Sequence, residues 1–120
     1  VASCVDEELN TRERARLELM LGDVKKNKYF QRDSINVLEV MAGCGRNIPA
    51  ILNVWPKSSI DLVDSSSAMV EAITEKSYMY SAAPINAKHM AIQDFPFEKN
   101  IYDLAIGWWA LSYLRKTERN

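Results

Sequence analysis

Short apolar runs alternate with helix-patterned segments along this chain, and that alternation limits the fold to few classes. The runs lie at residues 35–41, 59–64, 85–92 and 101–107. The first of them is nearly continuous in apolar residues, which is typical of a strand buried inside a parallel sheet. Strands that alternate with helices indicate an α/β fold with a doubly wound, mostly parallel sheet.

The segments between those runs predict helices. Residues 6–30 place Leu17, Met20, Leu21 and Val24 at i, i+3, i+4 and i+7, which predicts one amphipathic helix. Further helices are predicted at residues 46–54 and 68–76, and another is predicted to begin over residues 108–114. We therefore divide the chain into a helical segment at residues 1–34 and an α/β domain at residues 35–120.

Composition excludes several classes of protein. The chain has 120 residues, of which 48% are apolar and 26% charged, with a net charge of -1, so it is not a disordered chain. The near-neutral charge argues against nucleic acid as a partner. Its apolar runs are too short for a bilayer, which needs about 20 residues, so no membrane contact is predicted.

The cysteines and the histidine indicate neither disulfides nor a metal site. Cys4 and Cys44 match no zinc or redox spacing, and His89 has no partner at metal-ligand spacing. Reduced thiols predict a cytoplasmic or nuclear protein, and the start of the chain leaves open whether a targeting segment has been removed.

Two candidate binding segments follow the first two predicted strands, where doubly wound sheets bind their ligands. Gly43 and Gly45 form a turn that lets the backbone approach a ligand, although a plain tight connection would also need glycines. Asp64 ends the second strand, where a carboxylate can accept both hydroxyls of a ribose. The serines after Asp64 leave open that it caps a helix instead.

Two more candidate segments follow the later strands. Gln93 and Asp94 come after the third strand, where they could contact the edge of a purine ring. Trp108 and Trp109 follow the fourth, and one of them could form the wall of a binding site. A helix there would place Trp109 and Tyr113 on one face.

These residues carry a family resemblance over residues 35–114. Val37-Leu-Glu-Val-Met-Ala-Gly-Cys-Gly-Arg46 resembles the first motif of class I S-adenosylmethionine-dependent methyltransferases, and Asp61-Leu-Val-Asp64 resembles their acidic second-strand motif. More narrowly, Ile92-Gln-Asp-Phe-Pro-Phe-Glu98 and Tyr102-Asp-Leu-Ala-Ile-Gly-Trp-Trp109 resemble the alpha-N-terminal protein methyltransferases.

The resemblance implies a Rossmann-like fold that binds S-adenosylmethionine through residues 35–120, and a protein or small-molecule methyl acceptor. Gly43 and Gly45 would pass the methionine part of the cofactor, Arg46 would pair with its carboxylate, and Asp64 would take the ribose. The full implied binding set is Glu39, Gly43, Gly45, Arg46, Asp64, Ser65, Ile92 and Gln93. Trp109 and Tyr113 are the candidates for contact with the acceptor, with no catalytic base assigned.

The sequence also departs from the family pattern. Met41 stands where the pattern has its first glycine, and Tyr113 stands where some members carry a histidine that deprotonates an acceptor amine. The later strands of the family have no counterpart, so the domain is predicted to be incomplete, with a partner chain or dimer covering its sheet. These departures favour one alternative, a catalytically inactive methyltransferase-like subunit. A second alternative, a different nucleotide-binding module that uses a nicotinamide cofactor, would explain Asp64 and the glycines.

Overall fold

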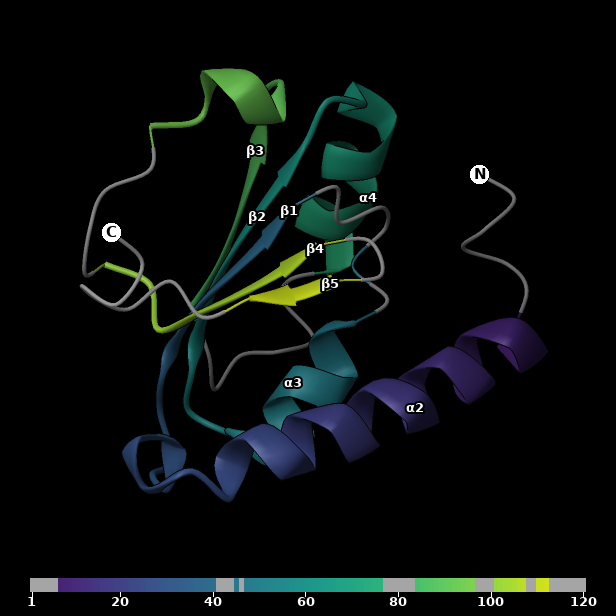
Figure 1. Cartoon of the computed structure of the whole chain (residues 1–120). Helices are drawn as coiled ribbons and strands as arrows, with labels where there is room; N and C mark the ends of the chain where they lie inside the picture. Colours follow the sequence, from purple (N-terminus) through teal and green to yellow (C-terminus); the bar gives the residue numbers. More distant parts are fainter. Residues whose placement is uncertain are drawn as a thin grey trace.

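The computed structural model describes residues 7–40, 45, 47–76, 84–96, 101–107 and 110–112. Its centre is one sheet whose strands lie in the order β3-β2-β1-β4-β5 (Figure 1). The strands are β1 (Asn36–Val40), β2 (Ser59–Asp64), β3 (Ile85–His89), β4 (Leu104–Gly107) and β5 (Ala110–Ser112). The first four are parallel to their neighbours and β5 is antiparallel to β4, which confirms the predicted Rossmann-like, mostly parallel sheet.

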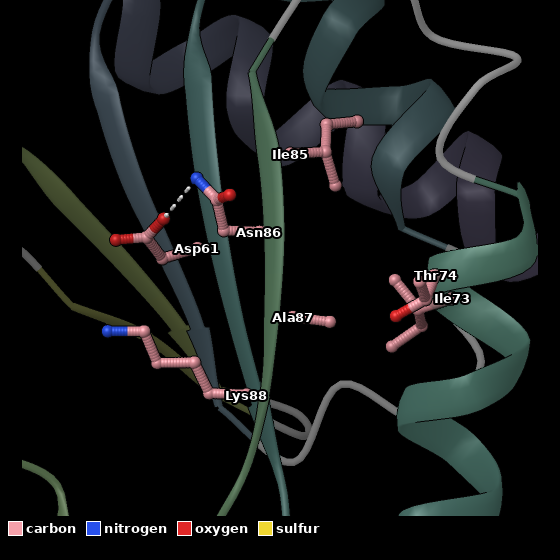
Figure 2. Close-up of a pocket in the computed structure, with 7 residues that line it drawn as sticks. All are labelled: Asp61, Ile73, Thr74, Ile85, Asn86, Ala87 and Lys88. Atoms are coloured by element: carbon pink, nitrogen blue, oxygen red, sulfur yellow. Dashed lines mark hydrogen bonds between the residues drawn. The ribbon is translucent and has the colours of Figure 1, made fainter.

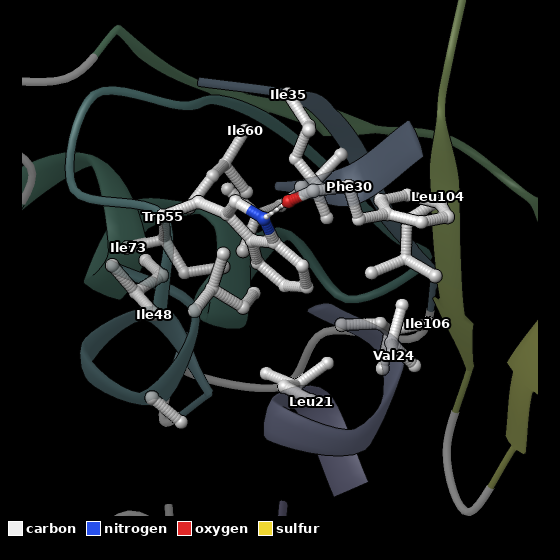
Figure 3. Close-up of a cluster of buried hydrophobic side chains, with 14 residues drawn as sticks. Leu21, Val24, Phe30, Ile35, Ile48, Trp55, Ile60, Ile73, Leu104 and Ile106 are labelled. Atoms are coloured by element: carbon white, nitrogen blue, oxygen red, sulfur yellow. Dashed lines mark hydrogen bonds between the residues drawn. The ribbon is translucent and has the colours of Figure 1, made fainter. Parts of the chain in front are cut away.

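Three helices cover one face of this sheet. They are α2 (Glu7–Lys25), α3 (Ile48–Val54) and α4 (Ser67–Lys76). Leu21 of α2, Ile48 of α3 and Ile73 of α4 join one buried cluster with apolar residues of β1, β2 and β4 (Figure 3). Trp55 lies fully buried in it, and its Nε1 donates a hydrogen bond to the Phe30 carbonyl at 2.9 Å. The indole can therefore be buried without leaving its N–H group unbonded.

The other face carries a smaller cluster. Leu38 and Val63 point to this side and pack with Phe95 and Tyr102. The alternation of inward side chains along β1 and β2 thus supplies both faces of the sheet, as expected of strands in a two-faced parallel sheet.

Polar contacts at the amino ends of the strands tie β4 to the segment before β1. The Asp103 carboxylate accepts hydrogen bonds from the Asn36 backbone N–H at 2.8 Å and from the Tyr29 hydroxyl. Arg32 approaches the same carboxylate at 3.2 Å and stacks over the Tyr29 ring at 4.4 Å. We call these four residues the Asp103 network.

Helix α2 is shorter than predicted. It ends at Lys25, and a separate 3-10 turn, η1 (Lys28–Phe30), follows with Asn27 as its cap. The Asn27 side chain accepts from the Tyr29 N–H at 2.9 Å, which starts a new turn and carries Phe30 into the core. The pattern also predicted Met20 on the inner face, but its side chain is 45% exposed.

The later strands are shorter than predicted too. β3 ends at His89: the Met90 N–H still makes a ladder hydrogen bond to the Asp64 carbonyl at 3.0 Å, but the Asp94 N–H then bonds the Ala91 carbonyl at 3.0 Å and closes a 3-10 turn, η3 (Ile92–Asp94). β4 begins only at Leu104. The Asp103 side chain is engaged in the Asp103 network, and the Asp103 backbone N–H donates to the Asn36 carbonyl.

The helix predicted over residues 108–114 is wrong over residues 110–112, which form β5. Gly107 pairs with Ala110, so β4 and β5 are antiparallel neighbours that lie two residues apart in the sequence. Short loops of this length suit antiparallel hairpins. Backbone pairing with β4 has overridden the weak helical pattern of this segment.

Helix α2 shares its core with the sheet through Leu21 and Val24. The division at residues 34 and 35 stays a prediction. Among the described helices, none combines the length and apolar character needed to cross a membrane.

Candidate functional site

The carboxyl ends of β1, β2, β3 and β4 meet at one edge of the sheet (Figure 1). In the strand register, Val40 lies beside Val63 and Asp64 lies beside His89. Strands β2 and β3 lie on one side of β1, and β4 lies on the other, so the chain order reverses between β1 and β4. Open α/β sheets bind ligands outside the strand ends at such a reversal.

Gly45 shapes the turn between β1 and α3. Its φ is +79°, and a Cβ built there would lie 3.0 Å from Ile48 Cδ1 and 3.3 Å from Ile73 Cγ1. Both the backbone conformation and the packing of α4 therefore require glycine at this position. Gly43 and Arg46, like Met41, lie outside the described residues.

Glu39, the residue before the last one of β1, is 1% exposed. Its Oε2 accepts a hydrogen bond from Nδ2 of Asn47, the residue that precedes α3. A buried carboxylate needs such partners, because its desolvation is costly. Glu39 thus ties the end of β1 to the start of α3, and Asn47 is a site residue that the sequence reading missed.

The turn after β2 is held by its own side chains. Asp64 Oδ1 accepts from the Ser66 N–H at 2.8 Å, and Ser66 Oγ accepts from the Met69 N–H at 3.3 Å. Capping of α4 is therefore supplied by Ser66, so the helix-cap alternative for Asp64 does not hold. Asp64 is half-buried and Ser65 exposed, at the carboxyl end of β2.

Ile92 and Gln93 lie in η3, just beyond the tip of β3 (Figure 1). Ile92 is half-buried and packs against the cluster of Leu38 and Val63, whereas Gln93 is exposed. Because β3 is the neighbour of β2, this turn lies at the same edge as Asp64. Trp109 and Tyr113 lie outside the residues whose placement is described.

His89 is a second residue that the sequence reading missed. Its Nε2 lies 3.0 Å from the Ser65 carbonyl oxygen. The absence of metal-ligand spacing led to its dismissal, whereas its place at the end of a strand beside Asp64 could have been a signal. Within the described parts of the chain, no three His, Cys, Asp or Glu side chains are close enough to share a metal ion.

A hollow of about 470 Å³ lies away from these strand ends, along the outer strand β3 (Figure 2). Ile85 and Ala87 point from β3 toward Ile73 of α4, while Asp61 and Lys88 lie on the opposite side of the strand. The residues that line this hollow therefore lie on both faces of the sheet, around the outer strand, and do not form one enclosed binding crevice. We place the candidate site at the strand ends.

The sequence pattern of one protein family, described as a methyltransferase domain, matches residues 37–120, which is more than half of the chain. No curated protein matches the sequence.

Solved structures with a similar fold include a protein from Galdieria sulphuraria described as a sarcosine dimethylglycine methyltransferase. It has a TM-score of 0.64 and 19% identity, over 78% of this chain and 35% of that one. A protein from Methanococcus maripaludis described as an S-adenosyl-L-methionine-dependent methyltransferase gives 0.57 and 17%, over 78% and 42%. The [4+2]-cyclase SpnF gives 0.57 and 13%, over 73% and 32%.

The chain thus spans less than half the length of these three structures. The cyclase among them is a reminder that the fold alone does not determine the reaction. The family match and the reversal of strand order at the candidate site agree with each other. On the family match, the chain belongs to the methyltransferase-domain family.

Proposed function

We propose that this chain binds S-adenosylmethionine at the carboxyl edge of its sheet and serves in methyl transfer. The observation that carries the proposal is the placement of Asp64. A half-buried carboxylate ends β2, at the same edge of the sheet as the η3 turn, within a domain that belongs to the methyltransferase family. A carboxylate only accepts hydrogen bonds and ribose hydroxyls donate them, so the chemistry of this residue fits the nucleoside.

The remaining binding residues are assigned by their place along the same edge. Ser65 and the η3 residues Ile92 and Gln93 would lie beside the adenine. Gly43 and Gly45 would pass the methionine part, above Glu39 and Asn47. The Arg46 guanidinium would pair with the methionine carboxylate, since a planar fork of donors matches a carboxylate bidentately.

When bound, S-adenosylmethionine supplies a sulfonium methyl group that a nucleophile attacks in line. The protein's part is to hold that group and the acceptor in line and to exclude water. The acceptor we propose is the α-amine at a protein N-terminus. The proposal rests on the segments around Gln93 and Trp109, which resemble the alpha-N-terminal protein methyltransferases. The net charge of -1 suits a protein or small-molecule acceptor better than nucleic acid.

An α-amine also reduces the need for a strong base. Its pKa is about 8, so a sizeable fraction is already neutral near pH 8, whereas a lysine amine with a pKa of about 10.4 stays almost wholly charged. Positioning by residues such as Trp109 and Tyr113 would then be sufficient for attack. Methyl transfer to a peptide with a free α-amine is expected to rise with pH up to about 8 and to vanish when that amine is acetylated.

The first test is calorimetric titration with S-adenosylmethionine and S-adenosylhomocysteine. Asp64→Ala and Arg46→Ala are each expected to weaken binding about tenfold or more, because each removes a charge-assisted hydrogen bond. Asp61→Asn is the matched control on β2. Asp61 lies three residues before Asp64, and its carboxylate accepts hydrogen bonds from the Tyr102 hydroxyl and the Asn86 amide. Cofactor affinity is therefore expected to change less than about twofold in this variant. No binding to either compound, with both alanine variants indistinguishable from the parent, contradicts the proposal.

Mass spectrometry of the peptides tests the transfer step separately. A mass gain of one methyl group on the free-amine peptide supports the proposed acceptor. Tight cofactor binding without transfer to any peptide would instead fit the inactive subunit. The partner chain and the cytoplasmic or nuclear location stay predictions, to be checked by the solution mass of the chain and by its localisation in cells.

A further inference from the structure

His89 stands at the point where the two halves of the proposed nucleoside site meet. It is the last residue of β3, and in the strand register it lies beside Asp64, the last residue of β2. Three residues later the chain enters η3 with Ile92. His89 therefore lies where the turn that carries Asp64 and Ser65 meets the segment that leads into η3.

The imidazole makes a directed contact with the first of these turns. Nε2 of His89 lies 3.0 Å from the Ser65 carbonyl oxygen. A carbonyl only accepts hydrogen bonds, so Nε2 carries the hydrogen and donates it. In the neutral ring, this contact selects the tautomer that carries its hydrogen on Nε2.

This contact completes the restraint of residues 64–66. The Asp64 carbonyl accepts from the Met90 N–H at 3.0 Å, and the Asp64 carboxylate accepts from the Ser66 N–H at 2.8 Å. Ser65 lies between those two anchors, and its own carbonyl accepts a hydrogen bond from His89. The Ser65 carbonyl and the Ser66 N–H belong to the same planar peptide unit. Rotation of that unit would therefore turn the Ser66 N–H away from Asp64 Oδ1.

We infer that His89 is a positioning residue for the nucleoside part of the cofactor, holding the Ser65 peptide so that the Asp64 carboxylate faces the ribose. This inference rests on the proposed function. The hydrogen bond is made at the surface, so its effect on folding is expected to be small, while its effect on the orientation of Asp64 acts directly on affinity.

The three variants of His89 separate the roles of the ring nitrogens. In length, the amide nitrogen of Gln matches Nε2 and that of Asn matches Nδ1, so His89→Gln keeps the donor and His89→Asn does not. His89→Ala and His89→Asn are expected to bind S-adenosylhomocysteine about threefold to tenfold more weakly than the parent, and His89→Gln within about twofold. 5′-Methylthioadenosine, which retains the nucleoside, is expected to lose affinity by the same factor.

Two measurements guard against a purely structural effect. The midpoint of thermal unfolding is expected to stay the same in all three variants. Without any ligand, the carbonyl carbon resonance of Ser65 is expected to shift in His89→Ala and His89→Asn and to return in His89→Gln, as the hydrogen bond is lost or kept.

Equal losses of affinity in all three variants would overturn the inference, as would weaker binding of S-adenosylhomocysteine with unchanged binding of 5′-methylthioadenosine. An unchanged Ser65 resonance in His89→Ala would show that the contact is not made. If the parent chain binds neither compound, the proposed function fails and the positioning role fails with it. The Ser65 resonance then still reports whether the contact itself exists, so the two failures are distinguishable.

Discussion

At the scale of single residues, Gly45 is the position where one added methyl group has the clearest consequence. Gly45→Ala places a Cβ on a residue with a φ of +79°, only 3.0 Å from Ile48 Cδ1. The left-handed conformation costs an alanine about 1–2 kcal/mol, and the crowding adds to that. We expect the free energy of unfolding in urea to fall by about 2 kcal/mol or more.

Gly22→Ala is the matched control. Gly22 lies inside α2, and a Cβ there would meet nothing within 4 Å. Alanine in a helix is better than glycine by about 0.5–1 kcal/mol, so this variant is expected to be slightly more stable than the parent. Equal effects of the two substitutions would contradict the role given to Gly45.

Residue positions along strands were predictable, whereas contacts across turns were not. Asp64 could be placed at the edge of the sheet because a strand has a fixed period and its apolar run ends there. The pairing of Glu39 with Asn47 and of His89 with Ser65 depends on how a turn folds back, which no local pattern encodes. The same limit explains why Asp64 could not be separated from a helix cap until the Ser66 contacts were known.

At the scale of elements, the Asp103 network joins η1, β1 and β4. Asp103→Ala removes the acceptor of the Asn36 N–H and of the Tyr29 hydroxyl. Loss of hydrogen bonds to a charged, mostly buried acceptor is expected to lower the free energy of unfolding by about 1–3 kcal/mol. Asp23→Ala is the control: it breaks an ion pair with Lys26 that is largely exposed, and we expect less than about 0.5 kcal/mol. Similar losses in both variants would mean that Asp103 acts only through surface charge.

The same network makes stability depend on pH in the alkaline range. Burial, and then the hydrogen bond to Asp103, raise the pKa of Tyr29 above its usual value of 10.0, while Arg32 acts in the opposite direction. The contribution of the protonated Tyr29 hydroxyl to stability is complete below about pH 10. As the pH rises from there through the pKa of the folded state, the unfolded chain loses the Tyr29 proton first, and stability decreases.

Urea unfolding of the parent and of Tyr29→Phe between about pH 8 and about pH 11 measures this contribution. Phenylalanine has no proton to lose, so the variant is expected to show the smaller decrease in unfolding free energy above about pH 10. Curves that stay parallel across that range would refute the role of Tyr29.

Elements were predicted well where their pattern was strong and poorly where another part of the chain competed. β2 was predicted with the bounds that the structure has, because its apolar positions alternate along its length. Residues 110–112 were assigned to a helix but pair with β4, so a tertiary contact overrode a weak local preference. The third strand was predicted to reach Ile92 but ends at His89, because a local bond from the Asp94 N–H to the Ala91 carbonyl closes the η3 turn.

At the scale of the whole molecule, α2 and the sheet share one core and are expected to unfold together. Leu21 of α2 is fully buried in the main cluster, whereas Leu19 on the same helix is 75% exposed. Leu21→Ala is expected to lower the unfolding free energy by about 2–5 kcal/mol, and Leu19→Ala by less than about 0.5 kcal/mol. Tryptophan fluorescence and far-ultraviolet circular dichroism are expected to give coincident transitions in Leu21→Ala. Two separate transitions would instead make residues 1–34 an independent unit.

The Asp103 network and the proposed cofactor site occupy opposite ends of the same strands. β1 has five residues, so four steps of about 3.3 Å separate its first residue from its last by about 13 Å. Energetic effects at sites this far apart without shared partners usually add. Substitutions that strengthen the amino ends can therefore be combined with substitutions that alter cofactor affinity, and each can be optimised without re-measuring the other. Thermal stability and ligand specificity can thus be altered by substitutions at separate positions in this molecule.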